Sequence, residues 1–197
     1  MIFYSKENDG MIKDQQALLV IDVQNEYFTG RLSVTYPEGS LGNILKAMDH
    51  AAREGMPVVV IQHTAPSKDS PTFRKGSEEW KLHPEIEKRE RDVLIEKNLP
   101  GSFTGTELEK WLKDRGVKSV AICGYMTQMC CDTTARQAFH LGFQVDFLSD
   151  ATGTLSVQNS AGAISDCDLH RAVMVTMAMK FARVIGTEEW IAERVTV

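Results

Sequence analysis

Short apolar runs alternate along the chain with longer stretches in which apolar residues recur every three or four positions. The short runs predict strands that are buried on both faces, and the longer stretches predict amphipathic helices. The expected strands cover residues 17–21, 56–63, 92–96, 117–123 and 144–148, with 182–185 as a candidate sixth; the expected helices cover 41–52, 106–115, 130–141 and about 158–180.

This alternation predicts βαβ units. We therefore expect an α/β, Rossmann-like fold, in which a doubly wound, mostly parallel sheet of five or six strands carries helices on both faces. Residues 15–197 are expected to form a single domain, and residues 1–14 an N-terminal extension. Because ligands of such sheets bind beyond the carboxyl ends of the strands, residues at those ends are the first candidates for chemistry.

Charge and cysteine usage narrow the classes of function. The formal net charge of −5 argues against a nucleic-acid-binding surface. No apolar run approaches the roughly 18 residues of a membrane helix, so no membrane partner is expected. The first residues lack the basic and then apolar pattern of a secretory signal, which favours a cytoplasmic location. The four cysteines have no CxxC spacing and are expected to be free thiols.

A nucleotide-binding function is disfavoured. No glycine-rich phosphate-binding motif follows any of the predicted strands. The first strand is followed by residues 22–26, Asp-Val-Gln-Asn-Glu, which are too bulky and acidic to hold a phosphate group. We therefore expect no dinucleotide and no other cofactor.

Two charged residues follow buried strands. Asp22 comes directly after the first strand, where an ionised carboxylate is costly unless it is paired. Its alternative role is that of a helix cap or a loop hydrogen-bonding residue. Lys97 follows the third strand and, taken alone, is typical of a solvated lysine. Because the carboxyl ends of parallel strands lie at one edge of the sheet, the two side chains can converge on one crevice.

Helix geometry separates the adjacent cysteines. A buried stripe with helical spacing contains Cys131, Ala135, Ala138, Phe139 and Gly142. Cys131 is therefore expected in the core, as are Cys123 and Cys167. Cys130 points about 100° away from the stripe, on a face with the polar Thr134 and Gln137.

Cys130 is also expected in the first turn of its helix, where the helix dipole stabilises a thiolate. The alternative is one more small buried side chain. A thiolate, a carboxylate and an ammonium group at one edge of a sheet are the components of nucleophilic acyl chemistry.

Three motifs follow the predicted strands in order. They are 18–25 (Leu-Leu-Val-Ile-Asp-Val-Gln-Asn), Lys97 with 101–103 (Gly-Ser-Phe) and 106–108 (Thr-Glu-Leu), and 124–135. The third, in which a glycine is followed by Thr127, Cys130 and then Thr134-Ala135, is the most specific. Over about residues 15–185, the chain resembles the isochorismatase-like cysteine hydrolases.

The resemblance implies a catalytic triad at Asp22, Lys97 and Cys130, the residues already singled out by their places in the sheet. It also implies a cis peptide bond before Met126. The backbone N–H groups of Met126 and Cys130 would form the oxyanion hole.

Two departures from branches of the family bear on the reaction. The nicotinamide-cleaving branches hold a metal with an Asp-x-His pair and a further His after the second strand. This chain has a single histidine there, His63, and no carboxylate until Asp69, so no metal site is expected. The enol-ether hydrolases tend to lack the nucleophilic cysteine, so the presence of Cys130 favours hydrolysis of a C–N bond.

We therefore expect a metal-independent cysteine amidohydrolase that acts on a small amide, carbamoyl or lactam-like substrate through a thioester. Phe28, His63 and Tyr125 are candidates for the pocket lining, with a satisfied strand-end histidine as the alternative for His63. The sequence does not name the substrate.

Two other functions stay open. One is a vinyl-ether hydrolase of the isochorismatase type, with Asp22 as the acid. The other is a non-catalytic protein that binds a metabolite or a partner. A redox role has little support, because no resolving cysteine lies at a recognisable spacing. The resemblance also implies a homo-oligomer, a dimer or a tetramer, for which the apolar stretch 171–179 could serve as interface or as core.

Overall fold

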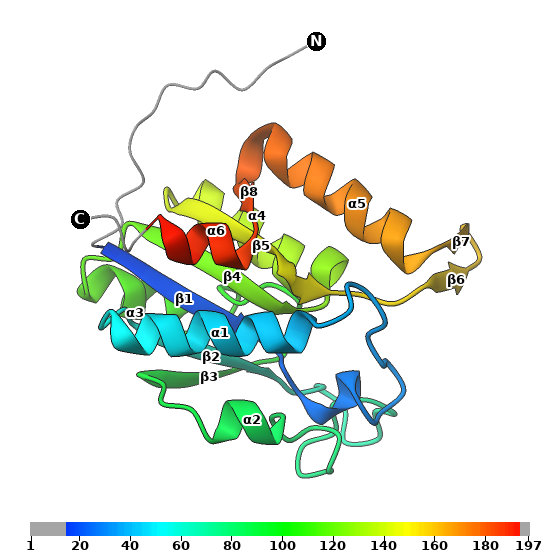
Figure 1. The fold of residues 1–197 in the computed structure, drawn as a ribbon. Helices are drawn as coiled ribbons and strands as arrows, with labels where there is room; N and C mark the ends of the chain where they lie inside the picture. Colours follow the sequence, from blue (N-terminus) through cyan, green and yellow to red (C-terminus); the bar gives the residue numbers. More distant parts are fainter. Residues whose placement is uncertain (1–14, 194–197) are drawn as a thin grey trace.

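The computed structural model describes residues 15–193, in which a six-stranded parallel sheet lies between two layers of helices (Figure 1). The strand order in space is β3-β2-β1-β4-β5-β8. The strands are β1 (Gln16–Ile21), β2 (Val58–His63), β3 (Val93–Lys97), β4 (Ser119–Tyr125), β5 (Gln144–Gly153) and β8 (Arg183–Ile185). The doubly wound α/β fold, including the candidate sixth strand, is thereby confirmed. The expected extension at residues 1–14 and the last four residues of the expected domain lie outside the described range.

Two apolar cores lie on opposite faces of the sheet. Alternate residues of β1 divide between them, with Leu18 in one core and Leu19 in the other. The first core is covered by α1 (Ser40–Arg53), α2 (Pro84–Glu87) and α6 (Thr187–Ala192), and the second by α3 (Leu108–Asp114), α4 (Asp132–His140), α5 (Asp166–Thr176) and the π-helical η4 (Met177–Phe181). No helix within residues 15–193 is both long and apolar enough to cross a membrane.

The strand order reverses between β1 and β4. β1 pairs with β2 on one side and with β4 on the other, and every pair is parallel. The chain after β1 forms the short 3-10 helix η2 (Asn25–Tyr27), and the chain after β4 forms the π-helical turn η3 (Thr127–Cys131). Both turns therefore begin at the edge of the sheet where a doubly wound fold places its ligand.

The helix expected at about 158–180 is partly wrong. It begins only at Asp166, and the hairpin of β6 (Val157–Asn159) and β7 (Gly162–Ile164) precedes it. Asn159 Oδ1 accepts a hydrogen bond from the backbone N–H of Ala161, and Gly162 has a φ of 140°. Ser165 then caps the helix by accepting from the N–H of Asp168. This turn and cap chemistry opposes helix before Ser165.

Three other expectations need correction. The strand expected at 144–148 is too short, because residues 149–153 continue β5. The helix expected to begin at Cys130 begins at Asp132, after the π-helical turn η3. Cys167, expected in the core, is partly exposed at the start of α5, where Arg171 donates a hydrogen bond to its sulfur. By contrast, Cys131, Ala135 and Ala138 form the expected buried stripe, whereas Phe139 is only partly buried and Gly142 is exposed.

Gly124 allows β1 and β4 to approach closely where the strand order reverses. It lies opposite Ile21, and a Cβ atom at this position would lie 2.0 Å from the Ile21 carbonyl oxygen. Its φ of 118° is also a value that L side chains rarely adopt. Asp22, the residue after Ile21, has a φ of 52°, in the left-handed region that few residues other than glycine adopt.

We expect Gly124→Ala to lower the free energy of unfolding by at least about 2 kcal/mol, because the methyl group would meet backbone rather than a movable side chain. Gly42→Ala is the matched control. Gly42 lies in α1 with open space at its Cβ position, so this change should stabilise the protein by up to about 1 kcal/mol. Urea unfolding of both variants checks the pair, and equal effects would show that the close approach does not matter.

Candidate active site

The structure brings Asp22, Lys97 and Cys130 together at the carboxyl edge of the sheet. They come from the end of β1, the end of β3 and the turn η3 after β4. The Lys97 ammonium nitrogen lies 2.7 Å from Asp22 Oδ2 and 3.3 Å from Cys130 Sγ. The side chains of Asp22 and Lys97 are fully buried, and Cys130 is 7% exposed. Three residues spread over 109 positions of sequence thus form one cluster.

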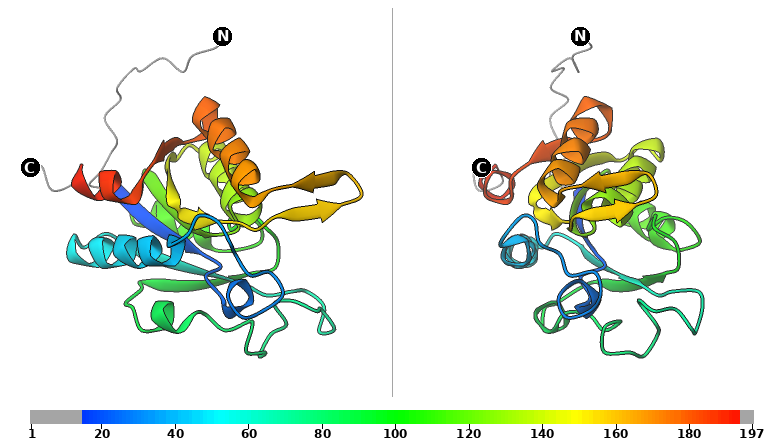
Figure 2. Two further views of the ribbon diagram at one scale, coloured as in Figure 1. Left: turned by 45° about the vertical axis from the view of Figure 1, so that its right-hand side comes forward. Right: turned by 90° about the vertical axis from the view of Figure 1, so that its right-hand side faces the viewer.

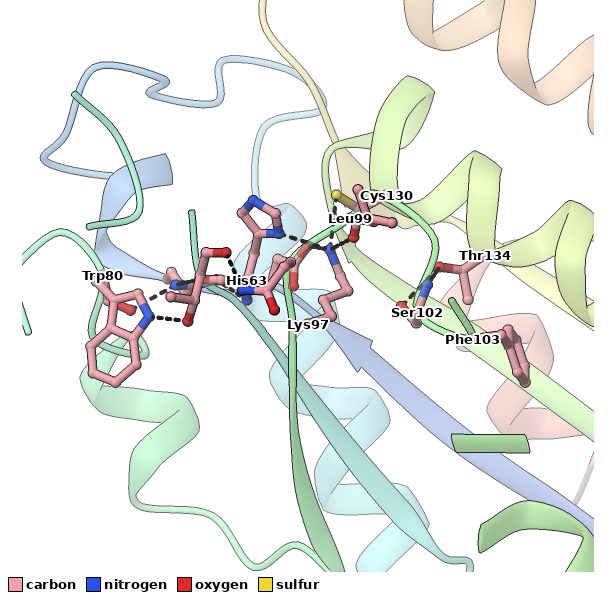
Figure 3. A network of polar contacts seen from close by, with 12 residues as sticks. His63, Trp80, Lys97, Leu99, Ser102, Phe103, Cys130 and Thr134 are labelled. Carbon is pink, nitrogen blue, oxygen red and sulfur yellow. Dashed lines mark hydrogen bonds and ion pairs between the residues drawn. The ribbon is translucent and has the colours of Figure 1, made fainter. Parts of the chain in front are cut away.

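The Lys97 ammonium has more acceptors than it has protons. Besides Asp22 and Cys130, it donates to the carbonyl oxygen of Leu99 at 3.1 Å and lies 3.4 Å from His63 Nδ1 (Figure 3). An ammonium group has three N–H donors, so these four groups compete for them. Lys97 is therefore held in the centre of the site.

Burial sets the proton affinities of the charged pair. Burial raises the pKa of Asp22 above its usual value, although the Lys97 charge opposes this shift. Burial lowers the pKa of Lys97, but Asp22 and then Cys130 raise it more, so that the net shift is upward. The ion pair with Lys97 at 2.7 Å holds the carboxylate in place. Asp22 is thus a buried carboxylate with a raised proton affinity.

Burial at Cys130 opposes the thiolate stabilisation that a helix dipole is expected to give. Burial raises the pKa of the Cys130 thiol, and the negative charge of Asp22 raises it further, against the opposing effect of Lys97. The residue lies in a π-helical turn rather than in the first turn of an α-helix. Desolvation therefore raises the energy of the thiolate, and use of the thiol as a nucleophile calls for a base beside it.

The backbone around η3 has the cis peptide bond that the family resemblance implies. It joins Tyr125 to Met126. The carbonyl oxygen of Met126 accepts from the N–H groups of Met129 and Cys131, at 3.1 and 3.2 Å. The oxyanion hole at the N–H groups of Met126 and Cys130 stays a prediction.

Of the three candidate lining residues, His63 contacts the cluster directly, through Lys97. Phe28 and His63 are both partly buried. Tyr125 is 1% exposed, and its hydroxyl group lies 3.1 Å from Ser40 Oγ. Its ring belongs to the core, which gives the side chain a packing role rather than a polar contact with a ligand. A continuous series of ring contacts joins these residues in the order Phe28, Tyr125, Tyr27, Phe73 and His63.

Gln24 is a site residue that sequence reasoning missed. Its buried amide donates to the carbonyl oxygens of His63, at 2.9 Å, and Trp80, at 2.7 Å. Its oxygen accepts from the His63 N–H at 2.8 Å. The side chain thereby ties the end of β2 and the following loop to β1. The sequence does contain one sign of this role: an amide side chain stands two positions after Asp22, where the chain leaves a buried strand.

The polar face of α4 holds the segment that follows Lys97. Thr134 Oγ1 accepts from the Ser102 N–H at 3.1 Å, and the two hydroxyl groups lie 2.9 Å apart (Figure 3). Gln137 accepts from the Phe103 N–H and donates to Thr104. Thr134 and Gln137 were expected as companions of Cys130, and they instead fix the loop after β3.

Metal ligands do not gather in the part of the chain that the structure describes. No group of three or more His, Cys, Asp or Glu side chains there is placed to hold an ion. His63 lies next to the Lys97 ammonium, which disfavours a second cation at this position. A mechanism without a metal stays a prediction.

A family profile described as "Isochorismatase domain" matches residues 16–189. The chain belongs to the isochorismatase family. Members of this family are hydrolases, so the protein is an enzyme of that class.

Relatives agree with this assignment over most of their lengths. A crystal structure of an isochorismatase-like protein from Burkholderia xenovorans has a TM-score of 0.88 and 47% identity, covering 90% of this chain and 86% of that one. Nicotinamidase 3 of Arabidopsis thaliana is 32% identical, covering 88% of this chain and 85% of its own length. The ureidoacrylate amidohydrolase RutB of Rhizobium rhizogenes is 24% identical, covering 70% of each chain.

The site generates a prediction on pH. Burial, and then the Lys97 charge, lower the pKa of His63 to about 4, against about 6.5 in an unfolded chain. Between these values the unfolded state binds more protons, so the free energy of unfolding rises with pH. The His63 contribution is complete above about pH 6.5 and is lost as the pH falls towards 4.

His63→Gln removes this titration. We measure the free energy of urea unfolding between about pH 4.5 and about pH 7.5. It should fall less steeply with decreasing pH in the variant than in the parent. Parallel profiles for the two proteins would mean that His63 is not held neutral by its surroundings.

Proposed function

We propose that this hydrolase cleaves a C–N bond of a small amide, carbamoyl or lactam-like substrate through a thioester on Cys130, without a metal. The single observation that carries the proposal is the contact of one ammonium group, Lys97, with both a carboxylate and a thiol, at 2.7 and 3.3 Å. A nucleophile, a base and an orienting charge within direct contact are the set that covalent acyl transfer requires.

In the first half of the proposed reaction, Asp22 takes the thiol proton while the sulfur of Cys130 attacks the substrate carbonyl carbon. The raised pKa of Asp22 favours this transfer, because burial makes the carboxylate a better base than one in water. The backbone N–H groups of Met126 and Cys130 receive the oxyanion. As the C–N bond breaks, Asp22 returns the proton to the leaving nitrogen.

In the second half, water attacks the thioester and Asp22 accepts one of its protons. The carboxylic acid product leaves as the C–S bond breaks and the proton returns to sulfur. Lys97 keeps its charge throughout, since Asp22 and Cys130 both raise its pKa. Its part is to hold Asp22 in place and to stabilise negative charge on sulfur.

The relatives support C–N hydrolysis by their names, one being a nicotinamidase and another an amidohydrolase. Phe28 and His63 are proposed to line the pocket. The four cysteines are free, which supports the further proposal of a cytoplasmic protein, because reducing compartments keep thiols free. The net charge of −5 supports the proposal that the protein has no nucleic-acid partner, and no membrane partner is proposed.

Replacing the proposed triad should abolish turnover on an amide that the parent hydrolyses. A screen of small amides, carbamoyl compounds and lactams for released ammonia or amine identifies such a substrate. Asp22→Asn, Lys97→Ala and Cys130→Ala should each lower kcat by at least about 10²-fold. Because the charged pair is buried, the first two changes should also cost stability, by about 3–5 kcal/mol for Lys97→Ala. Circular dichroism must therefore accompany each assay.

Cys131→Ala is the matched control. This neighbouring thiol is fully buried in the stripe that packs on the sheet, so its loss should cost about 1 kcal/mol of stability and leave kcat largely intact. Full activity of folded Cys130→Ala would contradict the thioester mechanism and favour a vinyl-ether hydrolase. Ligand-induced stabilisation without turnover of any compound would favour a non-catalytic binding protein.

The absence of a metal requirement is tested separately. Dialysis against a chelator should leave the amidase activity unchanged, because the mechanism uses only Asp22, Lys97 and Cys130. A loss of activity that zinc, iron or manganese restores would contradict this part of the proposal. Metal analysis of the dialysed protein provides the control for complete removal.

A further inference from the structure

His170 joins helix α5 to the turn that carries Cys130. It is 6% exposed, and its Nδ1 lies 3.0 Å from Oγ1 of Thr127. On the other side of the ring, Nε2 lies 2.9 Å from the carbonyl oxygen of Ser149 in β5. Thr127 is fully buried and is the first residue of η3. The ring therefore links three elements inside the protein, with α5 lying beside the end of β5 (Figure 2).

The two partners of His170 fix its tautomer. A carbonyl oxygen only accepts, so Nε2 carries the proton that bonds to Ser149. Burial lowers the pKa of His170, although the bond to Ser149 opposes this shift, so the ring is mainly neutral at neutral pH. Nδ1 is then unprotonated and accepts from the hydroxyl group of Thr127. His170 thus acts on Ser149 as a donor and on Thr127 as an acceptor.

The contact with His170 attaches η3 to a separate helix. Within the turn, the bonds to the Met126 carbonyl oxygen set the local shape of the backbone. Such local bonds do not set the position of the turn relative to β3, which carries Lys97. The hydroxyl group of Thr127 provides a contact that does, because it reaches α5 from a point three residues before Cys130.

A second contact holds η3 at the following residue. Gln128 Oε1 accepts from the hydroxyl group of Thr154 at 2.7 Å. Thr154 comes directly after β5, is fully buried and exchanges two backbone hydrogen bonds with Tyr36, at 2.7 and 3.0 Å. The ring of Tyr36 meets the ring of His170 edge-on, with the ring centroids 5.3 Å apart. The loop before α1 therefore supports both contacts of the turn.

A nucleophile needs closer placement than a side chain that only fills space. Cys130 Sγ lies 3.3 Å from the Lys97 nitrogen, and misplacing a reacting group by about 1 Å can lower a rate about 10²-fold. We propose that His170 is a positioning residue, which holds η3 through Thr127 so that Cys130 stays in contact with Lys97. This inference rests on the proposed role of Cys130 as the nucleophile.

Acylation by p-nitrophenyl acetate tests the proposal. The Cys130 sulfur forms a bond to the acetyl carbon, the C–O bond breaks to release coloured p-nitrophenolate, and the thiol proton passes to Asp22. With protein in excess, the colour measures the acylation rate, and Cys130→Ala gives the background. A parent no faster than Cys130→Ala would contradict the proposed function, and the role of His170 with it.

Two replacements of His170 separate its two bonds. The amide oxygen of His170→Asn lies about where Nδ1 lies, so Thr127 keeps its acceptor while Ser149 loses its donor. In His170→Gln the amide nitrogen reaches Ser149, and Thr127 loses its acceptor. The acylation rate should fall at least about 10-fold in His170→Gln and less than about 3-fold in His170→Asn. Equal losses in the two variants would show a packing role only and would overturn the proposal.

Replacing Thr127 tests the same bond from its other end. Thr127→Val keeps the shape of the side chain but removes the hydroxyl group, and it should slow acylation as much as His170→Gln does. Thr127→Ser restores the hydroxyl group and should restore the rate. Because both changes break one bond, the double variant Thr127→Val, His170→Gln should be no slower than either single variant. A folded Thr127→Val protein with the parent's rate would overturn the proposal even if His170→Gln does not fold.

His50→Gln is the matched control. His50 is also a buried histidine, 2% exposed, but it lies in α1 with its ring against Trp190. Its replacement should cost stability and leave the acylation rate unchanged. Circular dichroism confirms that each variant is folded. A loss of rate in His50→Gln equal to that in His170→Gln would mean that the assay reports general destabilisation, and this result would also contradict the proposal.

Discussion

The ion pair of Lys97 with Asp22 is the contact on which the site depends. Asp22 ends β1 and Lys97 ends β3, and β2 lies between these strands in the sheet. The two side chains therefore meet across the end of β2, in a place from which water is excluded. Such a buried pair adds little stability compared with two apolar side chains of the same size. Removing one partner, however, leaves an unpaired buried charge, which is strongly destabilising. The pair thus restricts the movement of the ends of β1, β2 and β3, so the loops that follow these strands start from fixed positions.

Two other contacts also fix the strand ends around the site. Gln24 joins the end of β2 to the chain after β1 through both backbone groups of His63. Gly124 lets β4 approach β1 closely enough to place η3, and with it Cys130, above the ion pair. Cys130 is therefore positioned by a backbone contact, Asp22 by an ion pair, and the loop after β2 by an amide side chain. Each of the three acts near the end of β1, where Asp22 itself has a positive φ of 52°.

The sheet and the meeting of Asp22, Lys97 and Cys130 could be predicted, because each depends on a local pattern. Buried parallel strands need continuous apolar runs, and a charged residue that ends such a run lies at the sheet edge. The β6–β7 hairpin was missed because its strands are short and exposed, so no apolar pattern distinguishes them from the start of a helix. The upward shift of the Cys130 pKa could not be predicted either, since it depends on how much water the whole fold excludes. Gln24 bonds to backbone groups of His63 and Trp80, which lie far along the chain. A pattern of side-chain types does not predict such contacts with the backbone.

Because Lys97 has only three N–H donors, its hydrogen bonding couples Cys130 to His63. Four acceptors surround three N–H donors, and His63 is the most distant of them. In the proposed cycle, a negatively charged sulfur attracts one donor strongly, and an acylated sulfur hardly attracts it at all. That donor then becomes available to the imidazole, which turns its other nitrogen, Nε2, into a better donor itself. In this way the hydrogen bonding of the His63 imidazole would depend on the chemical state of the Cys130 sulfur, with no movement of the backbone.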